Sequence, residues 1–383
     1  MPTSTSAQVR RSRIVPRRAG GTVELTLEPM PAAERAPARW SPSPPGVVAR
    51  VFVLALLLAV VLAIPFITSP VYLNVVARAA VFAIVGLSMN LLVGYTGQIS
   101  LGHAAFFGVG AFGSGYALSV MGLPFLAGLG IAMLTGAVAA FLLGGIALRV
   151  RGLYLALVTV AYGLFVQEVI FNLRGLTGGG AGMEAPRPAF AAGDIAYVYL
   201  CLAVLGLALA FDWRLMSSKA GRAIRALRDD ERVAASWGIN VTAYKLLAFT
   251  LSGILAALAG GLFASIEGVV VAADFPLQLS LTFLVMTVIG GAGNRWGVVQ
   301  GAVVFAVLPT LLDWAHVNIG IWPFTAITAT FEPVIGAMLL LLTLTFFPGG
   351  IAQQQEHLQR WLHFKKFHSE DGDSPLLTAS GGR

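Results

Sequence analysis

Charged residues are scarce in this chain. Asp, Glu, Lys and Arg make up 11% of its 383 residues, whereas 57% are hydrophobic. The mean hydropathy is +0.81, far from the profile of a soluble domain. This composition excludes a water-soluble globular fold. It predicts an all-α, polytopic integral membrane protein in which every backbone polar group is paired within a helix.

Cysteine and catalytic motifs are also missing. The one cysteine, Cys201, lies inside an apolar segment, so the chain has no disulfide framework. The sequence contains no G-x-x-x-x-G-K-S/T phosphate loop, no H-E-x-x-H, no Cys/His cluster and no G-x-S-x-G elbow with partner residues. We therefore expect no catalytic residue, no metal and no cofactor in this chain. Any ATP-driven work requires a separate subunit that binds the ATP.

The apolar residues form ten candidate membrane spans, approximately 48–67, 71–92, 103–121, 124–148, 153–172, 194–213, 246–265, 277–290, 297–314 and 329–348. With both termini in the cytoplasm, this topology places 22 of the 25 Lys and Arg on the cytoplasmic side, as the positive-inside rule requires. The placement explains the net charge of +7 without a nucleic-acid partner, because no basic stripe with interleaved aromatics is present.

One of these segments, 277–290, is short for a full crossing. Fourteen residues cover about 21 Å, less than the roughly 30 Å of a hydrocarbon core. It either borrows flanking residues or is re-entrant. We take it as a crossing, because a re-entrant segment would move the basic C-terminal tail to the other side.

The same pattern divides the chain into three parts. Residues 1–46, rich in Pro, Ser and Arg, are expected to form a disordered cytoplasmic extension. Residues 47–348 form a transmembrane domain that contains a long polar loop at 214–245, and residues 349–383 form a cytoplasmic tail.

The polar loop at 214–245 concentrates the charge. Ten of its 32 residues are charged, against 14 of the other 266 between residues 51 and 348. Its interior has helical periodicity: Ile224, Leu227, Ala234 and Trp237 gather on one side, and Gly238 ends the pattern. The loop either orients the chain only or binds a cytoplasmic protein. We favour binding, because an orienting loop needs no amphipathic helix with small residues.

Two glycine-rich stretches interrupt the apolar pattern, at 94–103 and at 290–297. Each contains Gly-x-x-Gly followed by an amide, Gln98 or Asn294. They indicate either helices that pack closely or broken helices that line a transport path.

Two single residues stand out beside these stretches. Arg78 lies within a span and must pair, snorkel or face a cavity. His103 has no second ligand at metal-binding spacing, so we interpret it as a hydrogen-bonded structural residue rather than a metal ligand or proton carrier.

Four motifs in order resemble a known family: GYTGQISLGHAAFFGVGAF (94–112), LTGGGAGM (176–183), AGRAIRALRDDERVAASWGINVTAYKLLAFTLSGILAALAGGLFA (220–264) and VIGGAGNRWGVVQGA (288–302). They look like the permease subunit of bacterial branched-chain amino-acid ABC importers, of the type whose first glycine loop continues into Ser-Leu-Gly-His. The resemblance covers approximately residues 70–350.

The resemblance implies a set of partners and a location. A second homologous permease subunit, two cytoplasmic ATPase subunits and a periplasmic substrate-binding protein would join this chain and its lipid in the bacterial inner membrane. The polar loop would then be the ATPase-coupling segment, in which Glu231, Ala234, Ala235 and Gly238 echo a Glu-Ala-Ala…Gly pattern. Substituting Glu231 and Gly238 is expected to lower ATPase association and uptake.

The candidate site residues form two sets. The ATPase-coupling set is Gly221, Arg225, Asp230, Glu231, Ala234, Ala235 and Gly238. The translocation-path set is Arg78, Gly94, Tyr95, Gly97, Gln98, Ser100, Gly102, His103, Gly293 and Asn294.

Other functions stay open at this point. Importers of urea and short-chain amides share this permease type, so the substrate is less constrained than the class. A stand-alone secondary transporter or channel would need intramembrane charges, and only Arg78 and Glu168 offer them. The third alternative is a membrane-embedded enzyme or a non-transporting scaffold, and the sequence contains no set of catalytic residues that would support an enzyme.

Overall fold

The computed structural model describes residues 12–19, 22–29, 65, 70–147 and 152–319. Contacts divide the chain into two units, residues 1–52 and 53–383. In the first unit, β1 (Ser12–Ala19) pairs antiparallel with β2 (Thr22–Pro29), and Ala19 lies opposite Thr22. This hairpin differs from the disordered extension expected for residues 1–46. The physical reason is local: Gly20-Gly21, a favoured two-residue hairpin sequence, precedes the run 22–29, in which polar and apolar residues alternate.

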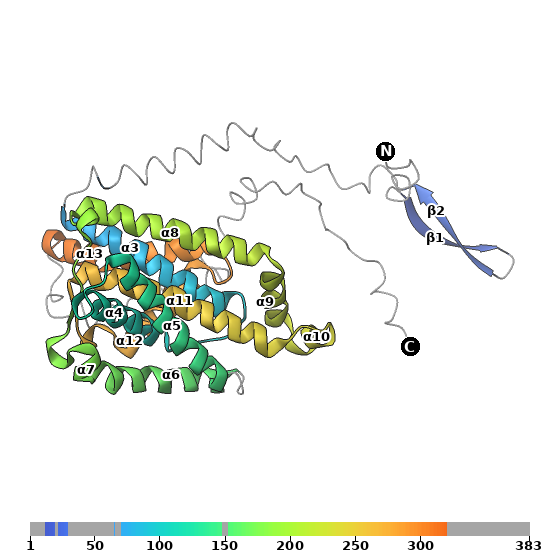
Figure 1. Ribbon diagram of the computed structural model, residues 1–383. Coiled ribbons are helices and arrows are strands. Elements are labelled where there is room, and N and C mark those ends of the chain that lie inside the picture. Colours follow the sequence, from blue (N-terminus) through green and yellow to red (C-terminus); the bar gives the residue numbers. More distant parts are fainter. Residues whose placement is uncertain (1–11, 20–21, 30–64, 66–69, 148–151, 320–383) are drawn as a thin grey trace. The chain divides into compact units, whose positions relative to one another are not determined.

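The second unit is a helical bundle (Figure 1). Its α-helices are α3 (Pro70–Met89), α4 (His103–Ser119), α5 (Phe125–Ala147), α6 (Leu153–Glu168), α7 (Arg174–Thr177), α8 (Asp194–Ser217), α9 (Lys219–Asp229), α10 (Glu231–Ser236), α11 (Val241–Glu267), α12 (Leu277–Gly290) and α13 (Arg295–Ile319). A π-helical turn, η2 (Asn90–Gly94), extends α3. Short elements complete it: η3 (Ile170–Asn172), η4 (Gly179–Ala181), β3 (Met183–Glu184), η5 (Ala189–Ala191), β4 (Val269–Val270), paired with β3, and η6 (Ala272–Asp274).

Six segments of the described residues are long and apolar enough to cross a membrane. Eight of the predicted spans coincide with helices: α3, α4, α5, α6, α8, α11, α12 and α13. The short segment at 277–290 gains length from the residues before it, and Ala272–Gly290 reaches 19 residues. The predicted spans 48–67, apart from residue 65, and 329–348 lie outside the described residues. The count of ten and the sides of the two termini therefore stay predictions.

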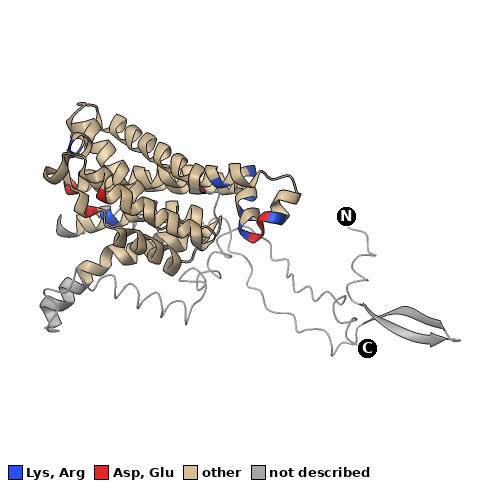
Figure 2. Ribbon diagram, turned by 90° about the horizontal axis from the view of Figure 1, so that it is seen from below, with Lys and Arg blue, Asp and Glu red and all other residues tan. Residues whose placement is uncertain are grey.

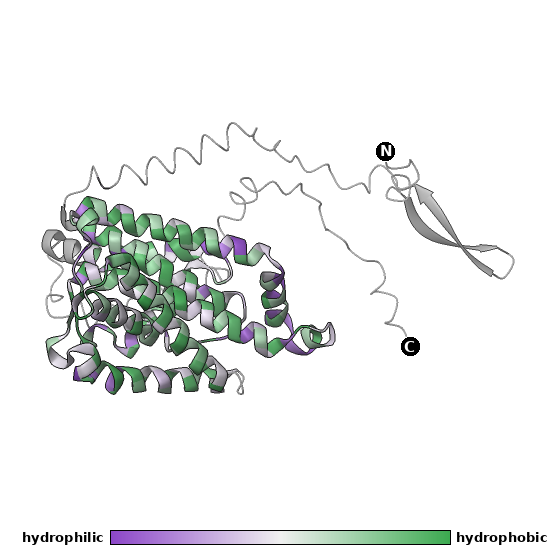
Figure 3. Cartoon of the chain, viewed as in Figure 1, coloured by the Kyte–Doolittle hydropathy of each residue, from purple (hydrophilic) through white to green (hydrophobic). Residues whose placement is uncertain are grey.

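Apolar and charged residues separate as a membrane protein requires. Hydrophobic residues predominate along α5, α6 and α8 (Figure 3), and Leu142, Tyr154 and Leu207 on these helices are exposed. Charged residues gather toward the two ends of the bundle (Figure 2). This arrangement matches helices that cross an apolar layer with both ends in water.

The centre of the bundle is α4, which packs between α5 and α11 through glycine. A Cβ atom added at Gly110 would collide with the carbonyl oxygen of Ala257, and one at Gly260 would collide with that of Phe107. Small residues let helix backbones approach closely in a membrane, where dispersion contacts stabilise the pair. The glycines of α4 and α11 therefore provide close packing of these two helices.

We expect Gly110→Leu to prevent stable packing of α4 against α11. Overfilling a packed core costs about 1–3 kcal/mol and sometimes more, and here the obstacle is backbone rather than a flexible side chain. The matched control is Gly130→Leu in α5, where an added Cβ meets nothing within 4 Å. Size-exclusion chromatography of detergent extracts should show loss of the folded peak for Gly110→Leu only. Equal folded yields for the two variants would contradict the packing.

Candidate functional site

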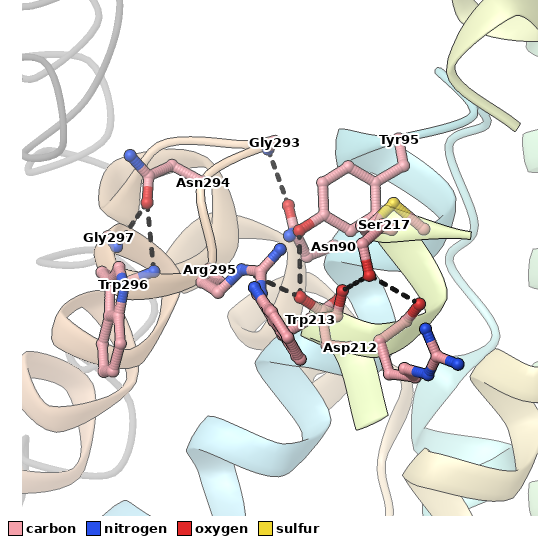
Figure 4. A network of polar contacts seen from close by, with 12 residues as sticks. Asn90, Tyr95, Asp212, Trp213, Ser217, Gly293, Asn294, Arg295, Trp296 and Gly297 are labelled. Atoms are coloured by element: carbon pink, nitrogen blue, oxygen red, sulfur yellow. Dashed lines mark hydrogen bonds and ion pairs between the residues drawn. The ribbon is translucent and has the colours of Figure 1, made fainter. Parts of the chain in front are cut away.

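The two glycine-rich loops meet at the end of the bundle where α9 lies. The backbone N–H of Gly293 donates a hydrogen bond to Asn90 Oδ1 at 2.7 Å, as Figure 4 shows. A Cβ atom at Gly94 would lie 2.5 Å from the nitrogen of Gly293 and would also collide with the Asn90 side chain. Backbones about 200 residues apart in the chain thus touch, and any side chain at Gly94 would push them apart. We call this contact, with the residues bonded to it, the glycine-loop junction.

Both loops use conformations that favour glycine. The φ angles are +69° at Gly97, +110° at Gly291 and +94° at Gly293. L-residues with a Cβ rarely adopt such values. The loops therefore need glycine for their shape, in contrast to the glycines of α4, which provide close packing.

A buried carboxylate anchors the junction to α8. Asp212 is 2% exposed; it accepts a hydrogen bond from Tyr95 Oη at 3.2 Å, and its Oδ2 lies 3.2 Å from Arg295 Nε. A buried charge requires such partners, because removing it from water is costly. Burial, and then the negative charge of Asp212, raises the pKa of Tyr95. Tyr95 therefore stays a neutral hydrogen-bond donor.

Three further path candidates lie in the two glycine-rich stretches. Asn294 Oδ1 accepts hydrogen bonds from the backbone N–H groups of Trp296 and Gly297, so it caps the start of α13. Gly102 occupies the position before α4. Gln98 is 7% exposed, and its Oε1 has no hydrogen-bond partner among the described residues.

His103 is fully buried in a chain of hydroxyl groups. Its Nδ1 lies 3.2 Å from Ser100 Oγ, and its Nε2 lies 3.0 Å from Ser252 Oγ. Ser252 in turn bonds with Ser88, which joins α4 to α11 and α3. No group of three or more His, Cys, Asp or Glu that could hold a metal occurs in the described part of the chain. The hydrogen-bonded interpretation of His103 agrees with this geometry.

Arg78 lies apart from the junction. It precedes Gly94 by 16 residues in one continuous helical stretch, which is about 24 Å. Its Nη2 is 2.6 Å from Glu267 Oε1, and its guanidinium lies 5.7 Å from the centre of the Phe263 ring. Of the three expected solutions for a cation in a span, the structure shows pairing.

The polar loop forms two short helices instead of one. The helix is interrupted at Asp230. The Oδ1 of Asp230 accepts hydrogen bonds from the N–H groups of Arg232 and Val233 and so caps α10. Ile224, Leu227 and Ala234 are buried. Trp237 is 82% exposed, so its predicted place on the same side as these three is wrong, because the break at Asp230 changes the direction of the helix. Gly238 ends α10 with φ +78°, which confirms the predicted stop.

Four contacts hold α9 and α10 to the bundle. Gly221 packs against the backbone of Met216, leaving no room for a Cβ, and Arg225 donates to the Met216 carbonyl at 2.9 Å. Arg228 Nη1 donates to the Gly94 carbonyl at 2.5 Å. Glu231 forms an ion pair with Lys245 on α11.

The Glu231–Lys245 pair gives Glu231, predicted from the sequence as an ATPase-coupling residue, a contact within the chain as well. The Lys245 side chain is 6% exposed and that of Glu231 is 26% exposed. Replacing Glu231 therefore disturbs an internal ion pair. The outward surface consists of other residues: Val233 is 54% exposed, and Ala235 and Gly238 are exposed while Ala234 is buried. We call Val233, Ala235 and Trp237 the exposed tip.

Sequence reasoning missed Asn90 and Asp212 as site residues. Each was visible as a polar side chain inside an apolar segment, which is the signal that singled out Arg78. Their partners, Gly293 and Arg295, lie far along the chain, so the sequence alone did not connect them.

The region of this chain that matches known proteins includes both loops of the junction and α9–α10. Residues 71–343 match the family described as branched-chain amino acid transport system / permease component. The high-affinity branched-chain amino acid transport system permease protein LivM of Salmonella typhimurium is 33% identical over 291 residues, 69% of this chain and 68% of that protein. The probable branched-chain amino acid transport permease protein LivM of Methanocaldococcus jannaschii is 25% identical over 318 residues, 72% of this chain and 91% of that protein. A shorter match, 31% over 174 residues (44% of this chain and 47% of that protein), is to the autoinducer 2 import system permease protein LsrC of an Enterobacter species.

Proposed function

Because this chain belongs to the family of permease components of branched-chain amino acid transport systems, we propose that it builds half of the path of an ABC importer. A second homologous permease subunit supplies the other half, and the path crosses the bacterial inner membrane. Branched-chain amino acids are the proposed substrate. Urea and short-chain amides are the alternative within the same transporter class, because the separate binding protein has a large share in selectivity.

The observation that carries the proposal is the exposed tip beside the glycine-loop junction. Trp237 and Val233 project from α10, while α9 contacts the first glycine loop through Arg228. Exposed aromatic and apolar side chains on a rigid support are typical anchors of protein interfaces. The partners that fit this tip are two cytoplasmic ATPase subunits, which bind the ATP that this chain has no motif to bind.

The opposite end of the bundle faces the periplasm in this proposal. Two ion pairs lie there: Arg78 with Glu267, and Arg187 with Asp194. A periplasmic substrate-binding protein delivers its ligand to this side. The N-terminus and the C-terminal tail are cytoplasmic, and cysteine labelling of the exposed position 225 from the cytoplasmic side tests this topology.

Reconstitution into liposomes tests the function. We expect ATP-dependent accumulation of leucine only when this chain is combined with the second permease, both ATPases and the binding protein. The control contains ATPase subunits whose phosphate-loop lysine is replaced, and it should show no accumulation. Leucine flux through the purified chain alone would contradict the proposal and favour a stand-alone transporter.

A further inference from the structure

A single side chain of α9 touches both glycine loops. Arg228 Nη1 donates to the carbonyl oxygen of Gly94 and lies 3.0 Å from the position of a Cβ on Gly293. Its Cγ lies 3.5 Å from that of a Cβ on Gly97. A side chain at Gly293 would therefore crowd the guanidinium, whereas the arginine stem passes Gly97 at ordinary van der Waals distance. Because the donor is charged, this hydrogen bond is stronger than one between neutral groups.

The acceptor belongs to an unusual turn. Gly94 is the last residue of the π-helical turn η2, and the N–H of Tyr95 bonds to the carbonyl of Asn90, five residues earlier. Such turns insert one extra residue into an α-helix and occur frequently at functional sites. Conversion of this turn to an α-helical one would rotate the residues after it and move Gly94.

Three contacts from three different segments hold this turn and the residue after it. Gly293, in the loop before α13, bonds to the Asn90 side chain. Arg228 of α9 bonds to Gly94, and Asp212 of α8 accepts from Tyr95. A displacement of α9 therefore acts first on Gly94, and through the Asn90 contact it reaches the second glycine loop.

The contacts of α9 can transmit such a displacement. Its buried face carries Ile224 and Leu227, and Glu231 at the start of α10 is joined to α11 through Lys245. The exposed tip comes directly after Glu231 in the sequence, in and just after the short helix α10. A partner that moves the tip thus moves α9 with its Arg228.

We propose that Arg228 is a positioning residue that couples movement of α9 to separation of the two glycine loops, and that the glycine-loop junction closes this end of the transport path. The inference rests on the proposed importer function and adds which residues connect the partner to the path. In the conformation described here, Gly94 and Gly293 are in contact and the path is closed at this end. When α9 moves away, Arg228 leaves Gly94, the π turn relaxes and the second loop is released.

The test uses the complete complex with its partner subunits and measures leucine imported per ATP hydrolysed. Arg228→Met and Asn90→Ala interrupt the same connection at two different links, and Arg222→Met is the matched control, an exposed arginine on the same helix. We expect Arg228→Met and Asn90→Ala to keep their ATPase subunits and hydrolyse ATP while import per ATP falls between about 5-fold and 150-fold, the range of typical coupling free energies. Arg222→Met should match the wild type.

A second readout follows the second loop directly. A cysteine at the half-buried position 292 reports its exposure to maleimide, and the buried Cys201 stays unlabelled. In the wild type, labelling should change between the nucleotide-free and the ATP-bound complex. Arg228→Met should remove that change.

The outcomes separate the inference from the function. An unchanged import per ATP in Arg228→Met overturns the inference, and so does nucleotide-dependent labelling at position 292 that persists. If Arg228→Met does not assemble with its partner subunits, the Asn90→Ala variant alone tests the inference. A wild-type ratio of leucine imported per ATP hydrolysed in Asn90→Ala, or loss of its complex, would show that these contacts have a structural role only. Absence of ATP-driven import in the wild-type complex would instead contradict the proposed function.

Discussion

Val233→Asp combined with Trp237→Asp should separate the ATPase subunits from this permease and reduce import to the level of empty liposomes. Trp237 is 82% exposed and Val233 is 54% exposed, so neither supports the fold of the bundle. In an interface each would be enclosed by the partner, and truncating one such anchor typically costs about 2 kcal/mol or more, which is roughly 30-fold in affinity. Two aspartates in an apolar contact add the cost of burying unpaired charges.

Co-purification measures this effect. The permease variant is captured by an affinity tag, and the ATPase retained after washing is quantified against the wild type. Thr242→Asp is the control, because it adds a negative charge at an exposed position at the start of α11. Wild-type retention of ATPase by the double variant would show that the exposed tip is not the docking surface, and the coupling role of α9–α10 would then need another contact.

Lys245→Met should have the second largest effect, through the orientation of α10. The substitution removes the Lys245 ammonium from the Glu231 carboxylate, whose side chain is only 26% exposed. Breaking a fully buried ion pair costs about 3–5 kcal/mol. Because solvent reaches Glu231, we expect about 1–3 kcal/mol here. Since α10 carries the exposed tip, its loss of position should lower both thermal stability and import.

The double variant Glu231→Gln with Lys245→Met identifies the cause. It removes both charges, so the stability lost in Lys245→Met should largely return. The measurement is the melting temperature of the purified permease in detergent, with import per complex as the second readout. If the double variant melts as early as Lys245→Met, the lost packing of the lysine stem is responsible and the loss of the ion pair is not.

Local features of the sequence were sufficient to predict that the chain is an integral membrane protein and where most of its helices lie. An apolar run of membrane length predicts a helix wherever it occurs, because each backbone group is satisfied within the run itself. The spans that fall on described residues therefore coincide with helices, from α3 to α13. The end of α10 before Gly238 was predictable for the same reason, since a positive φ after a helix is a property of one residue.

The junction was only half predictable. Glycine at 94 and at 293 indicated two interrupted helices, and the sequence suggested that both lie near a transport path. That Gly293 bonds to Asn90, and that Arg295 pairs with Asp212, depends on how α3, α8 and α13 pack. Residues so far apart in the chain leave no periodic pattern that a single sequence shows.

The sequence by itself determined that this is a polytopic membrane protein with a charged amphipathic segment and two glycine breaks, because hydropathy, charge and glycine act on their own neighbours. The permease assignment came from the resemblance of its motifs to a known family. Only the tertiary structure decided the contacts of these residues: Glu231 pairs with Lys245, Trp237 is exposed to solvent, and Arg228 donates a hydrogen bond to Gly94. The physical reason is that helix formation is settled within a few residues, whereas a partner for a buried charge or a free carbonyl is found only when helices pack.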